Sequence, residues 1–361
     1  MPKPETPIHL YDLEADELAS LLAQWGQPAF RARQVWEWLY RHYAADFESM
    51  TNLPGPLRER LATETTLSIG EIALAQHSAD GRTKKVLFRL PDGQFIETVL
   101  MRYEKRRTLC ISTQAGCAMG CVFCATGQMG FMRNLTVAEI VGQVLYFARE
   151  LAAESDSDAT HPVTNIVMMG MGEPLHNYNH TLAALDRLTD PTGFNLGARK
   201  ITISTVGLVP AIRRYADEQR QTPLAVSLHA ATDEERSRLM PVNRRWSIGE
   251  LMDACRYYVE KTGRRMTFEW ALIANENDTE EQAHKLGELL RGMLGHVNLI
   301  PLNPTAGYGG KPSSPEQVAR FQEVLSSYGV TSTVRVRRGI DIQAGCGQLR
   351  DRHLNDVGRV A

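Results

Sequence analysis

The feature that most constrains the fold is a regular alternation of strand-like and helix-like segments from residue 107 onward. Short apolar runs such as RTLCIST, VTNIVMM and MTFEWAL alternate with helical patterns such as TVAEIVGQVLYFARELA and SIGELMDACRYYVEKT. Six β-then-α units predict an α/β protein with a parallel sheet and right-handed crossovers. The sheet is either doubly wound or a complete or partial barrel. A seventh strand-like run, STVRVRR, and a loop containing Cys346 follow.

Polar residues gather just after the predicted strands, and this arrangement favours a barrel. Cysteines follow the first strand, GMGEP follows the second, and Ser204, His229 and Asn303 lie at or just after the ends of the third, fourth and sixth. Barrel enzymes build their sites on the loops at the carboxyl ends of the strands. We therefore expect one rim of the barrel to carry the chemistry.

The residues before this series predict two further parts. Three short helical patterns in the first 65 residues indicate a small helical domain. KKVLFRL and QFIETVLMRY alternate apolar and polar residues on either side of a PDG turn, which predicts a β-hairpin. We expect a helical accessory domain over 1–70, a linking hairpin over 71–106, a core over 107–350 and a tail over 351–361. The arginines of the helical domain serve either packing or RNA contact: Arg31, Arg33, Arg41, Arg58 and Arg60.

Glu97 interrupts an apolar row in the second hairpin strand. It falls on the same face as Phe95 and Val99. Such a carboxylate is either a strand-edge residue that points to water or a buried acid. The pattern alone leaves both interpretations open.

Composition and charge indicate a cytoplasmic protein. The amino end has no apolar signal segment, and no run reaches the roughly 18 apolar residues of a membrane span. The net charge of −2 argues against a protein held to nucleic acid by bulk charge. A reducing compartment disfavours structural disulfides, so clustered cysteines there indicate metal binding or catalysis.

Four of the six cysteines lie within fifteen residues, from Cys110 to Cys124. Cys117, Cys121 and Cys124 form a Cys-x3-Cys-x2-Cys pattern, and such soft ligands select zinc, copper(I) or an iron–sulfur cluster. Structural zinc normally takes four ligands, and no second pair completes such a set. A four-iron cluster held by three thiolates leaves one iron open to a small molecule. Cys255 has a core-like position in a helical pattern, which indicates packing.

The motifs together resemble a known enzyme family. CISTQAGCAMGCVFCATGQMGFMRNLT, MGMGEPLHNY, AVSLHA, LIPLNP and AGCGQLR are similar to the radical S-adenosylmethionine (SAM) RNA methyltransferases of the RlmN/Cfr family, over about residues 10–352. The resemblance is closest to the RlmN type, which acts on carbon 2 of adenine. It implies a partial (β/α)6 TIM-like barrel and a 4Fe-4S cluster on the three clustered cysteines.

The resemblance also implies a SAM site and a radical mechanism. SAM would be held by Gly172, Glu173, Ser204, Ser227, Leu228, His229 and Asn303. One SAM would methylate Cys346, and a second would be cleaved at the cluster. The carbon radical formed on methylated Cys346 would then add to carbon 2 of the base. Glu97 would accept the carbon-2 proton, and Cys110 would release the product by forming a transient disulfide with Cys346.

The same resemblance implies the partners. The substrates would be an adenosine in large-subunit (23S) ribosomal RNA and an anticodon-loop adenosine in tRNA, with flavodoxin or ferredoxin as electron donor. We expect a monomer without membrane contact. A base inside folded RNA must be flipped out to reach a barrel rim. Candidate phosphate contacts are Lys105, Arg106, Arg107, Arg335, Arg337 and Arg338.

Three alternatives stay open at this point. A carbon-8 adenine methyltransferase of the Cfr type, which confers antibiotic resistance, shares the same cysteines and most loops. A zinc-stapled RNA-binding protein would need no catalysis and would be colourless. A thiol redox protein would use a Cys-x2-Cys pair, although Cys121 and Cys124 have a third partner in Cys117.

Overall fold

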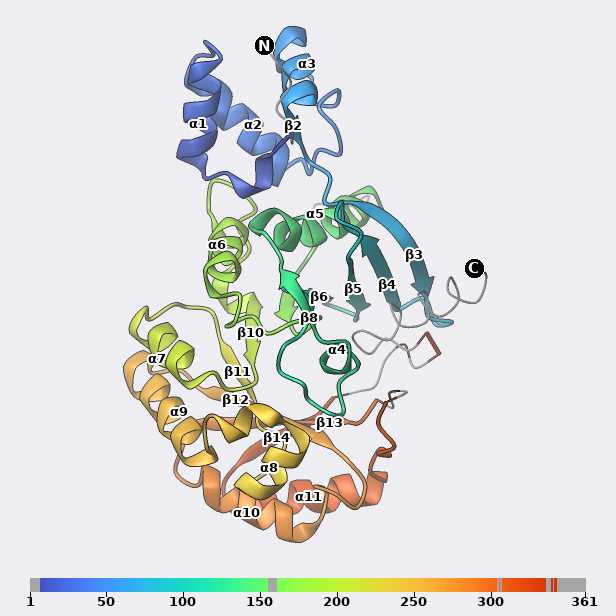
Figure 1. The fold of residues 1–361 in the computed structure, drawn as a ribbon, viewed down its shortest axis with the longest axis vertical. Coiled ribbons are helices and arrows are strands. Elements are labelled where there is room, and N and C mark those ends of the chain that lie inside the picture. Colours follow the sequence, from blue (N-terminus) through green and yellow to red (C-terminus); the bar gives the residue numbers. More distant parts are fainter. Residues whose placement is uncertain are drawn as a thin grey trace.

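A ten-stranded mixed sheet forms the centre of the molecule (Figure 1). The structure is a computed structural model that describes residues 7–154, 161–303, 305, 307–335, 339 and 341–342. The strand order is β14-β13-β12-β11-β10-β9-β6-β5-β4-β3. The parallel strands are β6 (Arg107–Cys110), β9 (Asn165–Met168), β10 (Ile201–Thr205), β11 (Leu224–Ser227), β12 (Met266–Leu272), β13 (Gly295–Pro301) and β14 (Thr331–Val334).

Helices follow the parallel strands and cover the outer side of the sheet (Figure 1). Neighbouring helices pack in pairs, α5 on α6, α7 on α9 and α10 on α11. These helices are α5 (Val137–Glu154), α6 (Tyr178–Thr189), α7 (Val209–Asp217), α8 (Asp233–Leu239), α9 (Ile248–Thr262), α10 (Glu280–Leu290) and α11 (Pro315–Ser327), with short 3-10 turns η2 (Ala198–Lys200) and η3 (Pro241–Arg244). The result is the expected partial barrel, a curved sheet with open edges at β14 and β3.

Local sequence signals set the ends of these helices. Ser247 and Glu250 form a reciprocal capping box at the start of α9. Gly263 ends the same helix in a left-handed conformation, with φ of 62°. Thr279 and Ser314 cap α10 and α11 through side-chain hydrogen bonds to backbone N–H groups.

The predicted hairpin is present and belongs to the main sheet. β4 pairs with β5 in antiparallel register, and β5 pairs in turn with β6, the first barrel strand. A further strand, β3, pairs with β4 and forms the other sheet edge. These strands are β3 (Glu71–His77), β4 (Thr83–Arg89) and β5 (Phe95–Arg102).

The amino-terminal helices form a lobe at one end of the barrel (Figure 1). The lobe contains β1 (Ile8–His9), η1 (Leu10–Asp12), α1 (Ala15–Gln24), α2 (Phe30–Tyr40), α3 (Gly55–Glu64) and β2 (Thr65–Thr66). Trp36 Nε1 donates a hydrogen bond of 3.0 Å to Asp190 beyond α6, and Arg149 of α5 donates to the carbonyls of Tyr43 and Ala44. The apolar core of the lobe is continuous with the barrel core, so the lobe is anchored on α5 and α6.

Candidate active site

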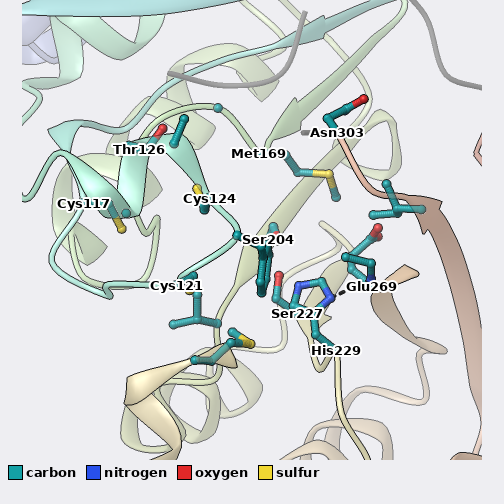
Figure 2. Close-up of a pocket in the computed structure, with 18 of the residues that line it drawn as sticks. Cys117, Cys121, Cys124, Thr126, Met169, Ser204, Ser227, His229, Glu269 and Asn303 are labelled. Atoms are coloured by element: carbon teal, nitrogen blue, oxygen red, sulfur yellow. Dashed lines mark hydrogen bonds between the residues drawn. The ribbon is translucent and has the colours of Figure 1, made fainter. Parts of the chain in front are cut away.

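A cavity of about 270 Å³ opens where the parallel strands end. Figure 2 shows the three clustered cysteines on one side of it and the strand-end residues Ser204, Ser227 and His229 on another. Small-molecule sites in proteins start at about 300 Å³. The cavity is slightly smaller than this lower bound, and it lies at the rim where the sequence predicts the chemistry.

The cysteine loop is held by a small two-stranded sheet of its own. β7 (Gln114–Gly116) pairs with β8 (Phe131–Asn134), and the short helix α4 (Ala125–Gln128) lies between them. A side chain at Gly116 would place a Cβ 2.0 Å from the carbonyl oxygen of Gly130, so only glycine fits. The Val122 N–H donates to the Leu239 carbonyl, which ties the loop to the end of α8.

The three cysteine side chains are well shielded from solvent. Cys117 and Cys121 are 8% and 7% exposed, and Cys124 is half-buried. Burial raises the pKa of Cys117 to about 12 and the pKa of Cys121 well above its ordinary value, and the neighbouring thiols add to both shifts. Thiols in such a place stay protonated unless a metal displaces the protons.

The donor chemistry of these three thiols fits an iron–sulfur cluster. A four-iron cluster binds each thiolate through a different iron, so its ligands need not converge on one point. Three thiols from one loop, facing a cavity of cofactor size, fit that group.

The loop after β9 brings Glu173 to the same cavity. Gly170 and Gly172 are required in this loop. A Cβ at Gly170 would lie 2.6 Å from the Ile111 carbonyl oxygen, and one at Gly172 would lie 2.5 Å from Gln114 Cβ. The Glu173 carboxylate is 2% exposed and accepts hydrogen bonds from the backbone N–H groups of Leu175 and Val206.

Burial raises the pKa of Glu173 to about 7, against the opposing effect of its hydrogen bonds. Through those bonds the carboxylate ties its own loop to the loop after β10. Glu173 therefore lines the cavity and also holds two of the loops around it in place.

The other predicted SAM residues occupy neighbouring strand ends. Ser204, Ser227 and Asn303 line the cavity, whereas Leu228 is fully buried in the core. His229 adopts a left-handed backbone with φ of 59°, and its Nδ1 accepts a hydrogen bond from the Ala271 N–H at 2.8 Å. Burial, with the nearby charge of Arg236, lowers the pKa of His229 to about 3. His229 is therefore a neutral hydrogen-bonding group.

Arg236 of α8 supports these strand ends from beneath. Its guanidinium is fully buried, and it donates hydrogen bonds to the carbonyls of Val206, Ser227 and Leu228 and to the side chain of Asn243. One charged group thus connects the ends of β10 and β11 to α8 and η3. The sequence analysis missed it because its pattern is that of an ordinary surface helix.

Glu269 is a second cavity residue that the sequence analysis missed (Figure 2). It lies on β12 and is 3% exposed, and burial raises its pKa. Oε1 accepts a hydrogen bond from Asn298, whereas Oε2 has no hydrogen-bond partner among the described residues and lies 4.0 Å from Arg335 Nη1. The detectable signal was a carboxylate inside the apolar run MTFEWAL.

Glu97 and Cys110 lie on adjacent strands of the main sheet. Glu97 is 2% exposed, and its Oε2 is 2.6 Å from the Nζ of Lys85. The buried-acid interpretation of Glu97 is therefore confirmed. Cys110 of β6 lies directly opposite Val99 of β5. Val99 is two residues beyond Glu97 on the same strand, so the side chains of Glu97, Val99 and Cys110 all lie on one face of the sheet. Cys346 lies outside the described residues.

The predicted RNA contacts are scattered. Lys105 and Arg106 are exposed at the turn between β5 and β6. The Arg107 guanidinium donates instead to the carbonyls of His161 and Pro162, which makes it structural. Arg335 lines the cavity and contacts Met169. Arg337 and Arg338 lie outside the described residues.

In the amino-terminal lobe, most of the predicted arginines have partners within the protein. Arg31 donates to Gln34 and Arg58 to the Glu48 carbonyl. Arg41 donates to the Pro191 carbonyl, and Arg60 pairs with Glu64. Arg33 is exposed. These contacts favour the packing interpretation for the first four.

Across the described ranges, no helix is both long enough and apolar enough to cross a membrane.

Known proteins match this chain over nearly its whole length. The family model "Ribosomal RNA large subunit methyltransferase N-terminal domain" matches residues 8–67, and the model of the radical SAM superfamily matches residues 111–287. The "Dual-specificity RNA methyltransferase RlmN 1" of Myxococcus xanthus is 57% identical over 96% of this chain and 95% of its own length. A "Probable dual-specificity RNA methyltransferase RlmN" of Chloroflexus aurantiacus is 52% identical over 96% of this chain and 95% of its own length.

A solved structure agrees with these relatives. The crystal structure of a radical SAM methyltransferase from Sphaerobacter thermophilus superposes with a TM-score of 0.90 at 52% identity, covering 95% of this chain and 99% of that one. The amino-terminal domain and the radical SAM domain are thus both matched, and the superposed structure covers nearly the whole fold. The chain belongs to the RlmN family of radical SAM RNA methyltransferases.

Proposed function

We propose that this enzyme methylates carbon 2 of an adenosine in large-subunit ribosomal RNA and of an anticodon-loop adenosine in tRNA. The observation that carries the proposal is the single cavity on which the three-cysteine loop and the strand-end residues Glu173, Ser204, Ser227 and Asn303 converge. The names of its relatives, dual-specificity RNA methyltransferases, support RNA as the substrate class.

Cys117, Cys121 and Cys124 are the residues that would hold a 4Fe-4S cluster, one per chain. When bound, such a cluster supplies the electron that splits the sulfonium of SAM. The polar strand ends would orient SAM, with Glu173 as acceptor for its amino group and Ser204, Ser227, His229 and Asn303 around its nucleoside. Glu173 and His229 are buried, which keeps water from their side of the site and would protect reactive species from side reactions.

The remaining chemistry would fall to three side chains. Cys346 would accept a methyl group from SAM on its sulfur and later carry that carbon to the base. Glu97 would take the proton from carbon 2. Once the adduct has given its unpaired electron back to the electron-transfer system, the Cys110 thiolate would attack the Cys346 sulfur, forming an S–S bond as the S–C bond breaks. The electron pair of the S–C bond would stay on the carbon, which would take up a proton to become the methyl group. A dithiol reductant would then restore both thiols by exchange.

The rest of the chain would serve RNA binding and electron delivery. Residues 1–70 would form the accessory RNA-binding domain, 71–106 a connecting hairpin, 107–350 the catalytic core and 351–361 a tail. Lys105 and Arg106, exposed near β6, are proposed phosphate contacts. Flavodoxin or ferredoxin would supply electrons to a monomeric, cytoplasmic enzyme.

The decisive experiment is anaerobic methylation followed by nucleoside mass spectrometry. Purified enzyme with SAM and a flavodoxin reducing system is incubated with a 23S rRNA fragment and, separately, with tRNA. We expect 2-methyladenosine in both digests and none with Cys124→Ala, while Cys255→Ala, a matched buried cysteine on α9, keeps activity. The purified protein should be brown, with about four irons per chain.

Two results would replace the proposal. A methyl group on carbon 8 would assign the enzyme to the alternative regiochemistry of the family. A colourless protein that retains zinc and binds RNA without methylating it would assign a binding role instead. Methylation of only one of the two RNAs would remove the dual specificity and leave the rest.

A further inference from the structure

A buried lysine, Lys85, lies against Glu97, the proposed proton acceptor. Lys85 of β4 is completely buried, and its Nζ is 2.6 Å from Glu97 Oε2 on β5. Lysine is almost never fully buried unless it is paired, because removing an ammonium from water is costly. A pair of this kind needs a reason beyond stability, since apolar side chains would often stabilise the same space equally well.

The pair faces away from the helical layer. On β5, the neighbouring Thr98 donates a hydrogen bond of 2.7 Å to Gln143 of α5. On β4, the neighbouring Lys84 pairs with Glu150 of α5 at 2.6 Å. Side chains alternate between the two faces of a strand, so Lys85 and Glu97 point to the inner side of the barrel sheet.

The inner face also carries Cys110, the proposed resolving thiol. In the strand register Val99 is directly opposite Lys85 on one side and Cys110 on the other. Glu97 is thus a diagonal neighbour of Cys110, and such neighbours lie roughly 7–8 Å apart. Among the described residues of the neighbouring strands, Lys85 and Cys110 are the titratable groups that face Glu97 from β4 and β6, and neutral Gln76 faces Lys85 from β3.

We propose that Lys85 is a positioning residue that keeps Glu97 ionised and directed toward the carbon-2 proton of the bound base. The inference rests on the proposed function, in which Glu97 is that proton's acceptor. In the step, the C–H bond breaks, the proton passes to a Glu97 carboxylate oxygen, and the electron pair stays on the base. Lys85 itself gives up no proton.

The physical argument concerns the charge state of a buried acid. Burial disfavours the charged form of a carboxyl group, and an adjacent cation restores it. Without Lys85, the buried Glu97 carboxylate would lose the cation beside it, which disfavours the ionised form that accepts the proton. Ser112 Oγ donates a hydrogen bond of 2.6 Å to the backbone carbonyl of Glu97. The backbone at Glu97 should therefore stay in place when the charge of Lys85 is removed.

The test compares four variants of the full enzyme from pH 7 to pH 9. Lys85→Met should slow RNA methylation roughly 10²-fold at pH 7, the lower end of what a positioned base contributes. Its rate relative to wild type should then rise between pH 7 and pH 9, because the ionised fraction of a weak acid grows with pH. Lys85→Arg should keep most of the activity, and Lys84→Met, a matched ion-pair loss on the outer face, should behave as wild type.

Three further readouts keep the outcomes distinct. Iron content and 5′-deoxyadenosine formation report whether a variant is folded and loaded, and Lys85→Gln replaces Lys85→Met if the latter is unstable. RNA deuterated at carbon 2 should be methylated more slowly than normal RNA by Lys85→Met, because proton removal now limits the rate.

Glu97→Gln separates the two hypotheses. If Glu97→Gln methylates RNA normally, the proposed role of Glu97 is wrong. If Glu97→Gln is inactive at every pH but loaded Lys85→Met is active at pH 7, or is impaired equally from pH 7 to pH 9, the inference about Lys85 is wrong and the role of Glu97 stands.

Discussion

Replacing Arg236 with methionine tests whether one buried charge supports the floor of the cavity. The guanidinium makes four hydrogen bonds of 2.6–3.1 Å, three of them to carbonyls at the ends of β10 and β11. Methionine keeps much of the side-chain volume but donates nothing. All four acceptors would lose the guanidinium in a region that water reaches poorly, although the Leu228 carbonyl would keep the Ala230 N–H at 2.8 Å.

The magnitude follows from these contacts. A hydrogen bond to a charged group contributes about 1.5–3 kcal/mol, so four give about 6–12 kcal/mol. Relief from burying the guanidinium offsets several kcal/mol of this. We expect a net loss of about 3–5 kcal/mol in the free energy of unfolding, a large share of the ~5–15 kcal/mol typical of whole proteins.

Urea unfolding under anaerobic conditions measures this loss, with SAM binding measured by calorimetry. Arg238→Met on the same helix is the matched control, because Arg238 is exposed and its loss should change stability by less than about 0.5 kcal/mol. SAM affinity should fall together with stability in Arg236→Met, since Ser204 and Ser227 lie on the strands that Arg236 joins. A loss below about 1 kcal/mol would refute the argument, because leaving even one buried acceptor unpaired should cost at least that much.

Three further predictions concern the cavity. Cys121→Ala should lower bound iron well below that of Cys255→Ala, as measured by metal analysis, and equal iron in the two variants would contradict the ligand assignment. Glu269→Ala should weaken SAM binding about tenfold by calorimetry, because Glu269 lines the cavity and its Oε2 has no hydrogen-bond partner among the described residues, so it can accept one from the cofactor; an unchanged Kd would exclude that contact. The pKa of His229 is lowered from 6.5 to about 3, so the stability that neutral His229 contributes is complete above pH 6.5 and is lost as pH falls toward 3. Wild type should therefore lose about 2 kcal/mol more than His229→Asn between pH 7 and pH 5, measured by urea unfolding, and parallel curves would show that His229 is not buried in its neutral form.

Much of the site could be predicted from the sequence because chain direction fixes where strands end. Parallel strands joined by helices place every carboxyl end on one rim. The cysteine loop, Glu173, Ser204, Ser227 and Asn303 therefore line one cavity although they span nearly 190 positions. Glycines such as Gly116 and Gly172 also indicate the site in the sequence. Neighbouring atoms lie too close at these positions for any side chain, so only glycine fits there.

Other features depend on pairings that no local pattern encodes. The hairpin strands look like a separate linker in the sequence, but hydrogen bonding between β5 and β6 makes them part of the catalytic sheet. Arg106 and Arg107 are neighbouring arginines that the sequence does not distinguish. In the structure Arg106 is exposed, whereas the guanidinium of Arg107 donates hydrogen bonds to the backbone carbonyls of His161 and Pro162.

The sequence by itself determined the α/β architecture, the rim that carries the chemistry and the thiols available to a cluster, because periodicity and spacing are local properties of the chain. Only the tertiary structure decided that Glu97 is buried beside Lys85, that Glu269 is buried at the cavity with Oε2 facing Arg335, and that Arg236 joins the strand ends. The charge state and hydrogen-bonding capacity of such groups depend on solvent exclusion and on partners distant in sequence. Those conditions arise only when the strands pair and the helices pack around them.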